Sequence, residues 1–150
     1  MTGDAVVNPS NFLVPIGTDV NELIEAAGGF KKEPEKIICG GPMMGIALFT
    51  TNIPVTKGTS AILAFMEDEV SKVTSSACIN CGRCLSVCPG RVMPARLADY
   101  AEHGDMESFV ANNGMECCEC GCCSYICPAK RNLTQAIKSM RKDVLASRKK

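Results

Sequence analysis

The sequence contains no Trp and only five Phe and two Tyr among its 150 residues, so an aromatic core does not hold the whole chain together. Sixteen Lys and Arg balance sixteen Asp and Glu, which argues against a general nucleic-acid binder. No stretch approaches the roughly 18 to 20 apolar residues that would span a bilayer, and no charged segment with an apolar run behind it marks a secretory signal. The sequence therefore predicts a protein with no transmembrane segment of its own, in a reducing compartment.

Cysteine is the residue in excess, with eleven in the chain. Only Cys39 lies in the first half, and the other ten fall between Cys78 and Cys127. In a reducing compartment, clustered cysteines indicate metal or redox chemistry more often than disulfides. The odd number of cysteines agrees with this interpretation.

The charge distribution divides the chain in two. Up to Glu69 there are nine acidic and four basic residues, whereas the remainder has seven acidic and twelve basic residues. The polar segment 67–77 separates these parts, so we expect a domain at 1–66, a linker at 67–77 and a second domain at 78–150. A unit this small rarely folds on its hydrophobic core alone, so the second domain needs an additional stabilising cross-link such as a bound metal.

The first domain is predicted to be a small sheet packed on one helix. Short β-type runs at 4–7 and 12–14 flank turn residues and predict a hairpin. The apolar spacing from Val20 to Ala27 predicts a helix, which Thr18 or Asp19 can cap. Further strands are expected at 37–39, 47–49, 55–57 and 60–65.

The second domain shows no convincing strand. Helical patterns occur at 94–103, at 106–112 after the cap Asp105, and at 133–147. The predicted fold class is therefore α+β, with a β-grasp-like sheet and helix followed by an all-α domain.

Two cysteine motifs of identical spacing dominate the second domain. Each reads C-x2-C-x2-C-x3-C-P, the first from Cys78 to Cys88 and the second from Cys117 to Cys127. This spacing is typical of bacterial-type [4Fe-4S] ligation, in which the fourth cysteine, before Pro, binds the other cluster. The rule assigns Cys78, Cys81, Cys84 and Cys127 to one cluster, and Cys117, Cys120, Cys123 and Cys88 to another.

Glycine and proline occupy matching places in the two motifs. Gly82 and Gly121 directly follow the second cysteine, where a positive φ helps the chain curl around a cluster. Pro89 and Pro128 bias the cysteine before them away from helical backbone. Both features favour a tight loop that turns its backbone toward the sulfurs.

Two other interpretations of the cysteines are weaker. Structural zinc sites separate their C-x2-C pairs by a dozen or more residues and have no use for a third cysteine at this spacing. A disulfide scaffold does not suit a reducing compartment. Cys39, Cys118 and Cys122 do not occupy positions of either motif and are expected to pack as small apolar residues.

The sequence resembles the C subunit of the Rnf-type electron-transport complex. The resemblance lies in the run 78–128, with Glu119-Cys120-Gly121-Cys122-Cys123-Ser124-Tyr125 in its second motif, and in the segments 11–18, 40–45 and 54–60. It implies a soluble-ligand-binding β-grasp domain followed by a helical, ferredoxin-like domain with two [4Fe-4S] clusters.

The resemblance also implies a function. Members of this family are peripheral subunits on the cytoplasmic face of the bacterial inner membrane, and they pass electrons between NADH and ferredoxin while the complex moves Na⁺ or H⁺. Their FMN- and NADH-binding region lies upstream, and no G-x-G-x-x-G loop occurs in this sequence, which suggests a fragment. We therefore expect single-electron relay, no catalytic residue in this chain, and other subunits with a ferredoxin or flavin redox partner.

Two alternatives to this function remain at the level of the sequence. Cobalamin reductases of the propanediol-utilisation type share the same modules and also relay electrons. An interaction module would use its clusters only to hold the second domain together, and redox cycling of the clusters distinguishes it from a relay.

Overall fold

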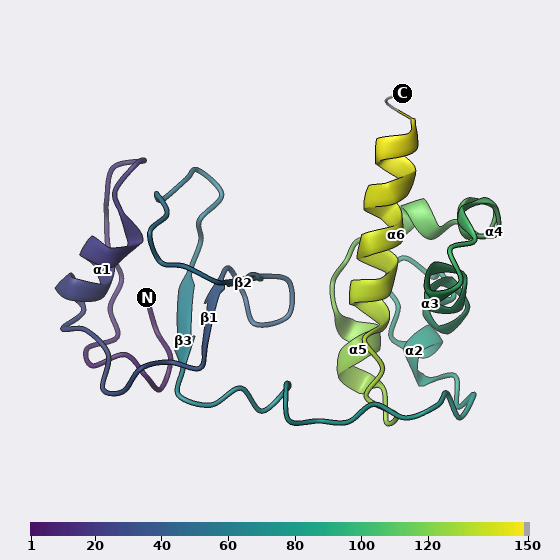
Figure 1. The fold of residues 1–150 in the computed structure, drawn as a ribbon, viewed down its shortest axis with the longest axis horizontal. Helices are drawn as coiled ribbons and strands as arrows, with labels where there is room; N and C mark the ends of the chain where they lie inside the picture. The colour runs from purple at the N-terminus through teal and green to yellow at the C-terminus, as the bar shows by residue number, and fades with distance from the viewer. Residues whose placement is uncertain (149–150) are drawn as a thin grey trace. The chain divides into compact units, whose positions relative to one another are not determined.

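A computed structural model describes residues 1–148 of the protein (Figure 1). The chain divides after Lys72 into two compact units, which begin at Met1 and Val73. The first unit carries all the strands and one helix, and the described part of the second is helical. The α+β fold class predicted from the sequence is thereby confirmed.

The first unit is built on a three-stranded antiparallel sheet. Strand β1 lies between the other two, and Ile38 in β1 is opposite Ala47 in β2 and Leu63 in β3. The elements of this unit, in chain order, are α1 (Val20–Ala26), β1 (Lys36–Cys39), β2 (Ile46–Leu48) and β3 (Ile62–Phe65).

Helix α1 forms where the apolar spacing predicts it. The Asp19 carboxylate accepts a hydrogen bond from the Asn21 N–H at 2.7 Å and so caps the first turn. The buried face of the helix carries Val20 and Leu23, which pack with Val55 and Ile62. This packing joins the helix to the sheet.

One predicted hairpin and one predicted strand are wrong. Residues 4–7 and 12–14 form no hairpin, because the Val7 and Asn8 N–H groups donate to the carbonyls of Gly29 and Ala27 at the end of α1. Residues 55–57 form no strand, because Val55 exchanges hydrogen bonds with Gly17 and Thr18 in the loop before α1. In both places, donors and acceptors are satisfied by the region around the helix rather than by a neighbouring strand.

The second unit consists of short helices around one long helix. The predicted helices are present as α3 (Pro94–Glu102), α4 (Met106–Ala111) and α6 (Leu133–Ser147). Asp105 caps α4, with its carboxylate accepting from the Ser108 N–H at 2.9 Å. Three shorter elements were not expected: α2 (Arg83–Ser86), the 3-10 turn η1 (Gly114–Glu116) and α5 (Cys122–Ile126).

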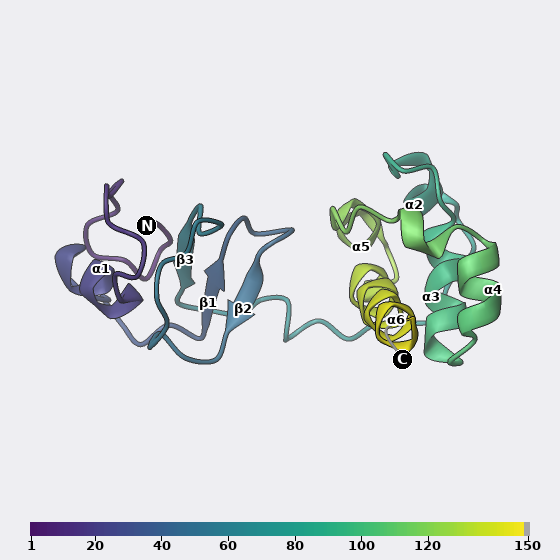
Figure 2. The ribbon, with the colours of Figure 1, turned by 90° about the horizontal axis from the view of Figure 1, so that it is seen from above.

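The core of the second unit lies where α3 and α4 pack on α6. Leu97, Phe109 and Ile137 are fully buried there. A second apolar cluster joins Ala98 of α3 and Leu133 of α6 to Cys123 of α5. Figure 2 looks along α6, with α5 against one side and α3 against another. Helices α3 and α6 thus form the scaffold that supports the cysteine loops.

Candidate metal centre

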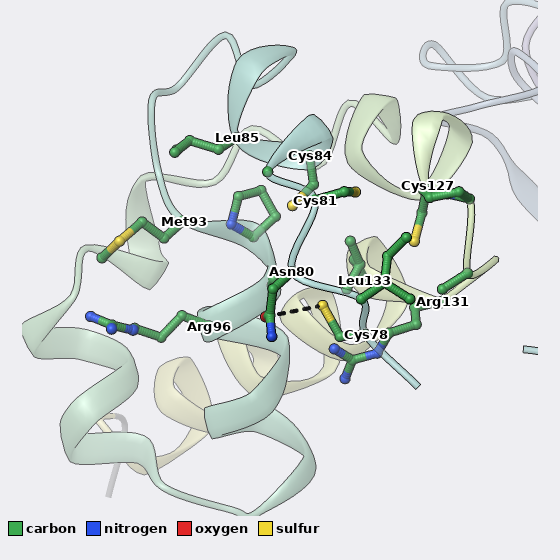
Figure 3. Close-up of a pocket in the computed structure, with 16 residues that line it drawn as sticks. Cys78, Asn80, Cys81, Cys84, Leu85, Met93, Arg96, Cys127, Arg131 and Leu133 are labelled. Carbon is green, nitrogen blue, oxygen red and sulfur yellow. Dashed lines mark hydrogen bonds between the residues drawn. The ribbon is translucent and has the colours of Figure 1, made fainter. Parts of the chain in front are cut away.

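Four cysteines line a cavity in the second unit. This cavity has a volume of about 220 Å³, and Figure 3 shows the side chains that line it. Two of its cysteines come from the loop that leads into α2, the third lies in α2 itself, and the fourth directly follows α5. They are Cys78, Cys81, Cys84 and Cys127, the set expected for the first cluster.

A second, tighter cavity of about 10 Å³ brings together the other predicted set. Its lining cysteines include Cys88, Cys117, Cys120 and Cys123, with Cys118 beside them. Cys123 is buried, with 7% of its surface exposed. In contrast, Cys78 and Cys81 of the first cavity are exposed, so the two cysteine sets differ in their access to solvent.

The two motifs fold into loops of the same backbone pattern. Gly82 and Gly121 have φ angles of 73° and 82° and begin α2 and α5, as their place in the motifs predicted. Two positions earlier, Asn80 and Glu119 also have positive φ, at 54° and 56°. Residues with left-handed backbone therefore flank Cys81 and Cys120, and the chain curls around each cavity.

Polar groups contact the first sulfur of each loop. In the first loop, the Cys78 thiol donates to Oδ1 of Asn80 at 3.7 Å (Figure 3). In the second loop, the backbone N–H of Glu119 donates to Sγ of Cys117 at 3.4 Å. N–H groups directed at cysteine sulfur stabilise the thiolate form that binds metal.

Burial raises the pKa of the Cys117 and Cys123 thiols above its ordinary value. The N–H of Glu119 opposes this effect at Cys117, and the Thr134 hydroxyl opposes it at Cys123. Ligation by these cysteines must therefore release protons, and binding to this set depends on pH.

The donor set fits an iron–sulfur centre. The first cavity presents four soft thiol donors and the second presents five, and apolar residues such as Leu85, Met93 and Leu133 line the first cavity around its cysteines. Within residues 1–148, no three His, Cys, Asp or Glu side chains meet closely enough to hold a single metal ion. The second set encloses less space, so a bound cluster would spread its side chains apart.

Two arginines beside the cysteine loops were missed by the sequence analysis. Arg131 lines the first cavity, and its Nη2 lies 2.7 Å from both carboxylate oxygens of Glu102. Arg141, on α6, pairs with Glu119 in the second loop. The pairs join segments far apart in the chain, so no local pattern identifies them.

The three cysteines outside the two motifs have different surroundings. Cys39 packs against the apolar cluster of Val20 and Ile62, as expected for a small apolar residue. Cys118 is exposed, so the expectation that it packs in the same way is wrong. Cys122, in the first turn of α5, is partly buried.

In residues 1–148, no helix is both long and apolar enough to cross a membrane.

Family models match both units of the chain. The SLBB domain matches residues 1–47, and a 4Fe-4S binding domain matches residues 72–93. The second match contains the whole first motif, from Cys78 to Cys88. Iron–sulfur binding, expected from the spacing, is therefore supported by a family that binds this type of cluster.

Individual relatives cover nearly the whole chain. The chain is 45% identical over 149 residues to the C subunit of the Na(+)-translocating ferredoxin:NAD(+) oxidoreductase complex of Acetobacterium woodii, covering 99% of this chain and 34% of the relative. It is 38% identical over 141 residues to the C subunit of an ion-translocating oxidoreductase complex of Methanosarcina acetivorans, covering 94% and 32%. A proton-translocating counterpart from Clostridium ljungdahlii is 47% identical over 98 residues, covering 65% and 21%.

The chain spans about a third or less of the length of these relatives. Each relative is named as the C subunit of an ion-translocating oxidoreductase complex, in agreement with the resemblance in the sequence. Over almost its whole length, the chain is homologous to part of the C subunit of the Rnf-type ion-translocating oxidoreductase complexes.

Proposed function

We propose that this chain is the electron-relay segment of an Rnf-type C subunit and holds two [4Fe-4S] clusters. The observation that carries the proposal is that each cavity is lined by three spaced cysteines of one motif and the last cysteine of the other motif, with Cys118 as an additional cysteine at the second cavity. Cys78, Cys81, Cys84 and Cys127 would hold one cluster, and Cys88, Cys117, Cys120 and Cys123 the other. When bound, such clusters accept and release single electrons.

The surrounding residues of this chain set the conditions for that chemistry. The Glu119 N–H favours negative charge on Cys117 Sγ, and apolar side chains such as Leu133 limit the access of water. Arg131 lines the first cavity with its guanidinium paired to the Glu102 carboxylate. No residue is proposed to make or break bonds in a substrate; the protein's role is to position the cysteines and tune their electrostatics.

The first cavity has the features of a site for electron exchange with another protein. Cys78 and Cys81 are exposed, and so are Ile79 and Leu85, by 66% and 50%. Arg83 and Arg96 are exposed nearby, and no Asp or Glu occurs in residues 73–98. This basic, apolar surface is complementary to an acidic redox protein such as a ferredoxin.

The buried Cys123 supports an internal position for the second cluster, with the first cluster next to the partner. In the complete complex, we propose that other subunits and an upstream FMN- and NADH-binding region complete the route. The segment would work as a peripheral component on the cytoplasmic face of the membrane. Because the three relatives described are all C subunits of ion-translocating complexes, this role is favoured over a cobalamin-reductase relay.

A second candidate function is that of an interaction module in which the clusters are purely structural. It is favoured by exposed apolar side chains around β2, where Phe49 is fully exposed and Met44 and Ile46 are more than half exposed. Such a surface is typical of a contact with a partner. Both functions can coexist, because this surface and the cysteine loops belong to different units.

Reduction under anaerobic conditions separates the two functions. The iron-loaded chain is titrated with dithionite and then mixed with an oxidised acidic ferredoxin, while visible absorbance and EPR report the cluster state. A relay predicts reversible reduction and rapid reoxidation by the ferredoxin. Clusters that stay inert to the reductant would favour the structural role, and stoichiometric zinc without iron would refute both cluster hypotheses.

A further inference from the structure

The two cysteine loops place different residues at the same left-handed position. Asn80 and Glu119 each precede the second cysteine of their motif and have φ angles of 54° and 56°. Asn adopts this conformation readily, because its short amide makes local hydrogen bonds. Glu119 lacks a short amide of this kind, and its side chain forms a long-range interaction instead.

Helix α6 supplies that interaction. Arg141 forms an ion pair with the Glu119 carboxylate, and Nζ of Lys138 lies 3.7 Å from the second carboxylate oxygen. The side chains of Glu119 and Arg141 are largely buried, with 27% and 23% exposed. The carboxylate is thus fixed against a long helix that is itself anchored in the core through Ile137 and Met140.

The backbone of the same glutamate contacts the cysteine set. Its N–H donates to Cys117 Sγ at 3.4 Å, so the residue that pairs with Arg141 also contacts a sulfur of the second set. The pair therefore links α6 to a sulfur of the second set in two steps. Arg141 holds the carboxylate, and the positioned backbone holds the sulfur.

We propose that Arg141 is a positioning residue for the second cluster. Its ion pair fixes the Glu119 carboxylate and so holds the second loop where the Glu119 N–H is directed at Cys117 Sγ. This inference rests on the proposed function, since it concerns the cluster that Cys117 would help to hold. It adds a specific consequence: the second loop depends on α6, whereas the first loop, with Asn80, does not depend on an equivalent pair.

The geometry argues against a merely stabilising ion pair on the surface. Exposed pairs of this kind contribute little to folding. The Nε of Arg141 is buried and has no hydrogen-bond partner among the residues that the structure describes. Burying an N–H donor without a hydrogen-bond partner lowers the stability of the fold, which is unfavourable for a surface residue that has no other role. Its position beside the second loop is accounted for by a role toward that loop.

The test compares Arg141→Met with Lys142→Met in the full chain loaded with iron. Lys142 is an exposed cation in the same helix turn and serves as the matched control. Redox titrations followed by EPR give the midpoint potential of each cluster, and loss of colour in a chelator gives cluster retention. The two signals are assigned beforehand with Cys78→Ser and Cys117→Ser.

Arg141→Met is expected to lower the potential of the second cluster, because an N–H to sulfur and a nearby cation both favour the reduced state. Its affinity for that cluster should fall by about 10- to 100-fold, the usual effect of removing an outer-shell partner. The first cluster and the Lys142→Met variant should be unchanged. Unchanged values in Arg141→Met, or equal shifts in both clusters, would overturn the proposal.

A rescue variant tests the positioning role. Arg141→Met with Glu119→Asn places in the second loop the residue that the first loop uses and removes the carboxylate together with the cation, so the retention of the cluster and its potential should both return toward the wild type. If the double variant loses the cluster as fast as Arg141→Met, the positioning role is wrong.

A reciprocal change covers the case in which Arg141→Met fails to load iron at all. Asn80→Glu places in the first loop a glutamate that has no equivalent of the Arg141 ion pair, and it should lower the retention of the first cluster only. An unaffected first cluster contradicts the proposal. A wild-type chain without iron would instead refute the proposed function itself.

Discussion

Cys127 lines the same cavity as Cys78, although Cys78 opens the first cysteine motif and Cys127 closes the second. The second cavity repeats the relationship with Cys88 and Cys117. A short loop holds three corners of a cubane but cannot wrap around to the fourth, so a distant cysteine must complete each set. The two loops are therefore expected to fold interdependently.

Single substitutions of the fourth cysteines test this crossing. Cys127→Ser should damage the cluster that Cys78→Ser also damages, because both residues line the first cavity. Cys88→Ser should match Cys117→Ser instead. Each variant should retain about four irons per chain in the other cluster. EPR spectra of the reduced variants and their midpoint potentials identify the surviving cluster.

If each motif instead supplied all four ligands of its own cluster, the pairs would exchange. Cys127→Ser would then resemble Cys117→Ser, and Cys88→Ser would resemble Cys78→Ser. Such a result would contradict the cavity assignment.

The basic surface around the first cavity should govern exchange with an acidic partner. Reversing Arg83 and Arg96 to Glu is expected to slow electron transfer to an acidic ferredoxin by about tenfold or more at low ionic strength, because charge complementarity accelerates encounter. The difference should shrink as salt screens it. Stopped-flow rates measured over a range of salt concentrations give the comparison.

Arg148→Glu provides the control for this change. Arg148 follows the end of α6, the helix whose first residue, Leu133, lines the cavity. Its reversal should leave the rate unchanged. Equal slowing in all variants would mean that net charge, rather than the surface at the first cavity, sets the rate.

The only histidine offers a pH test of the second unit. The Nδ1–H of His103 donates to the Asp99 carbonyl at 2.8 Å, and this bond, followed by the nearby Asp99 carboxylate, raises the pKa of His103 above its ordinary value of 6.5. Protonation then favours the folded state. The contribution is complete below the unfolded pKa and disappears as pH rises through the folded pKa.

An NMR titration of the single imidazole measures this pKa directly. We expect a value above 6.5 in the wild type, and a lower value in Asp99→Asn, which keeps the carbonyl but removes the charge. Substitution of Glu107, an acidic residue of α4, should change it less. A wild-type pKa at or below the ordinary value would show that the hydrogen bond is absent in solution.

A pair of glycines in the turn between β1 and β2 tests the packing of the first unit. A Cβ at Gly45 would collide with the Ile38 side chain and with the carbonyls of Gly41 and Cys39, whereas a Cβ at Gly41 meets nothing within 4 Å. Gly45→Ala is expected to lower the free energy of unfolding by about 1–3 kcal/mol. Gly41→Ala should change it by less than about 0.5 kcal/mol.

Urea denaturation followed by far-UV circular dichroism compares these two variants with the wild type. Similar effects of both substitutions would indicate that the turn relaxes around an added methyl group. The register of β1 and β2 would then be less tightly fixed than the structure indicates.

The sequence predicted those elements whose signals are local. Spacing predicted two sets of four cysteines, and the members of each set line one cavity; apolar periodicity identified α1, α3 and α6. The predicted hairpin failed because Val7 and Asn8 use their N–H groups on α1, and alternation in a strand does not reveal its partner. Helices α2 and α5 are too short for periodicity to detect.

The contact between Glu119 and Arg141 also depends on tertiary structure and not on a local sequence pattern. Neither residue is unusual in the sequence, and a positive φ at a glutamate has no local signature. Only the packing of α5 and η1 against α6 places the second loop beside Arg141. Motif spacing therefore identifies the cysteine ligands but not the charged residues that position a metal-binding loop.

The most direct test of the account is the iron content of the chain, reconstituted and purified without oxygen. The account predicts about eight irons and eight acid-labile sulfides per chain, with a broad visible absorbance that dithionite bleaches. A colourless, well-folded chain from an iron-replete preparation, or one that holds zinc in place of iron, would contradict it.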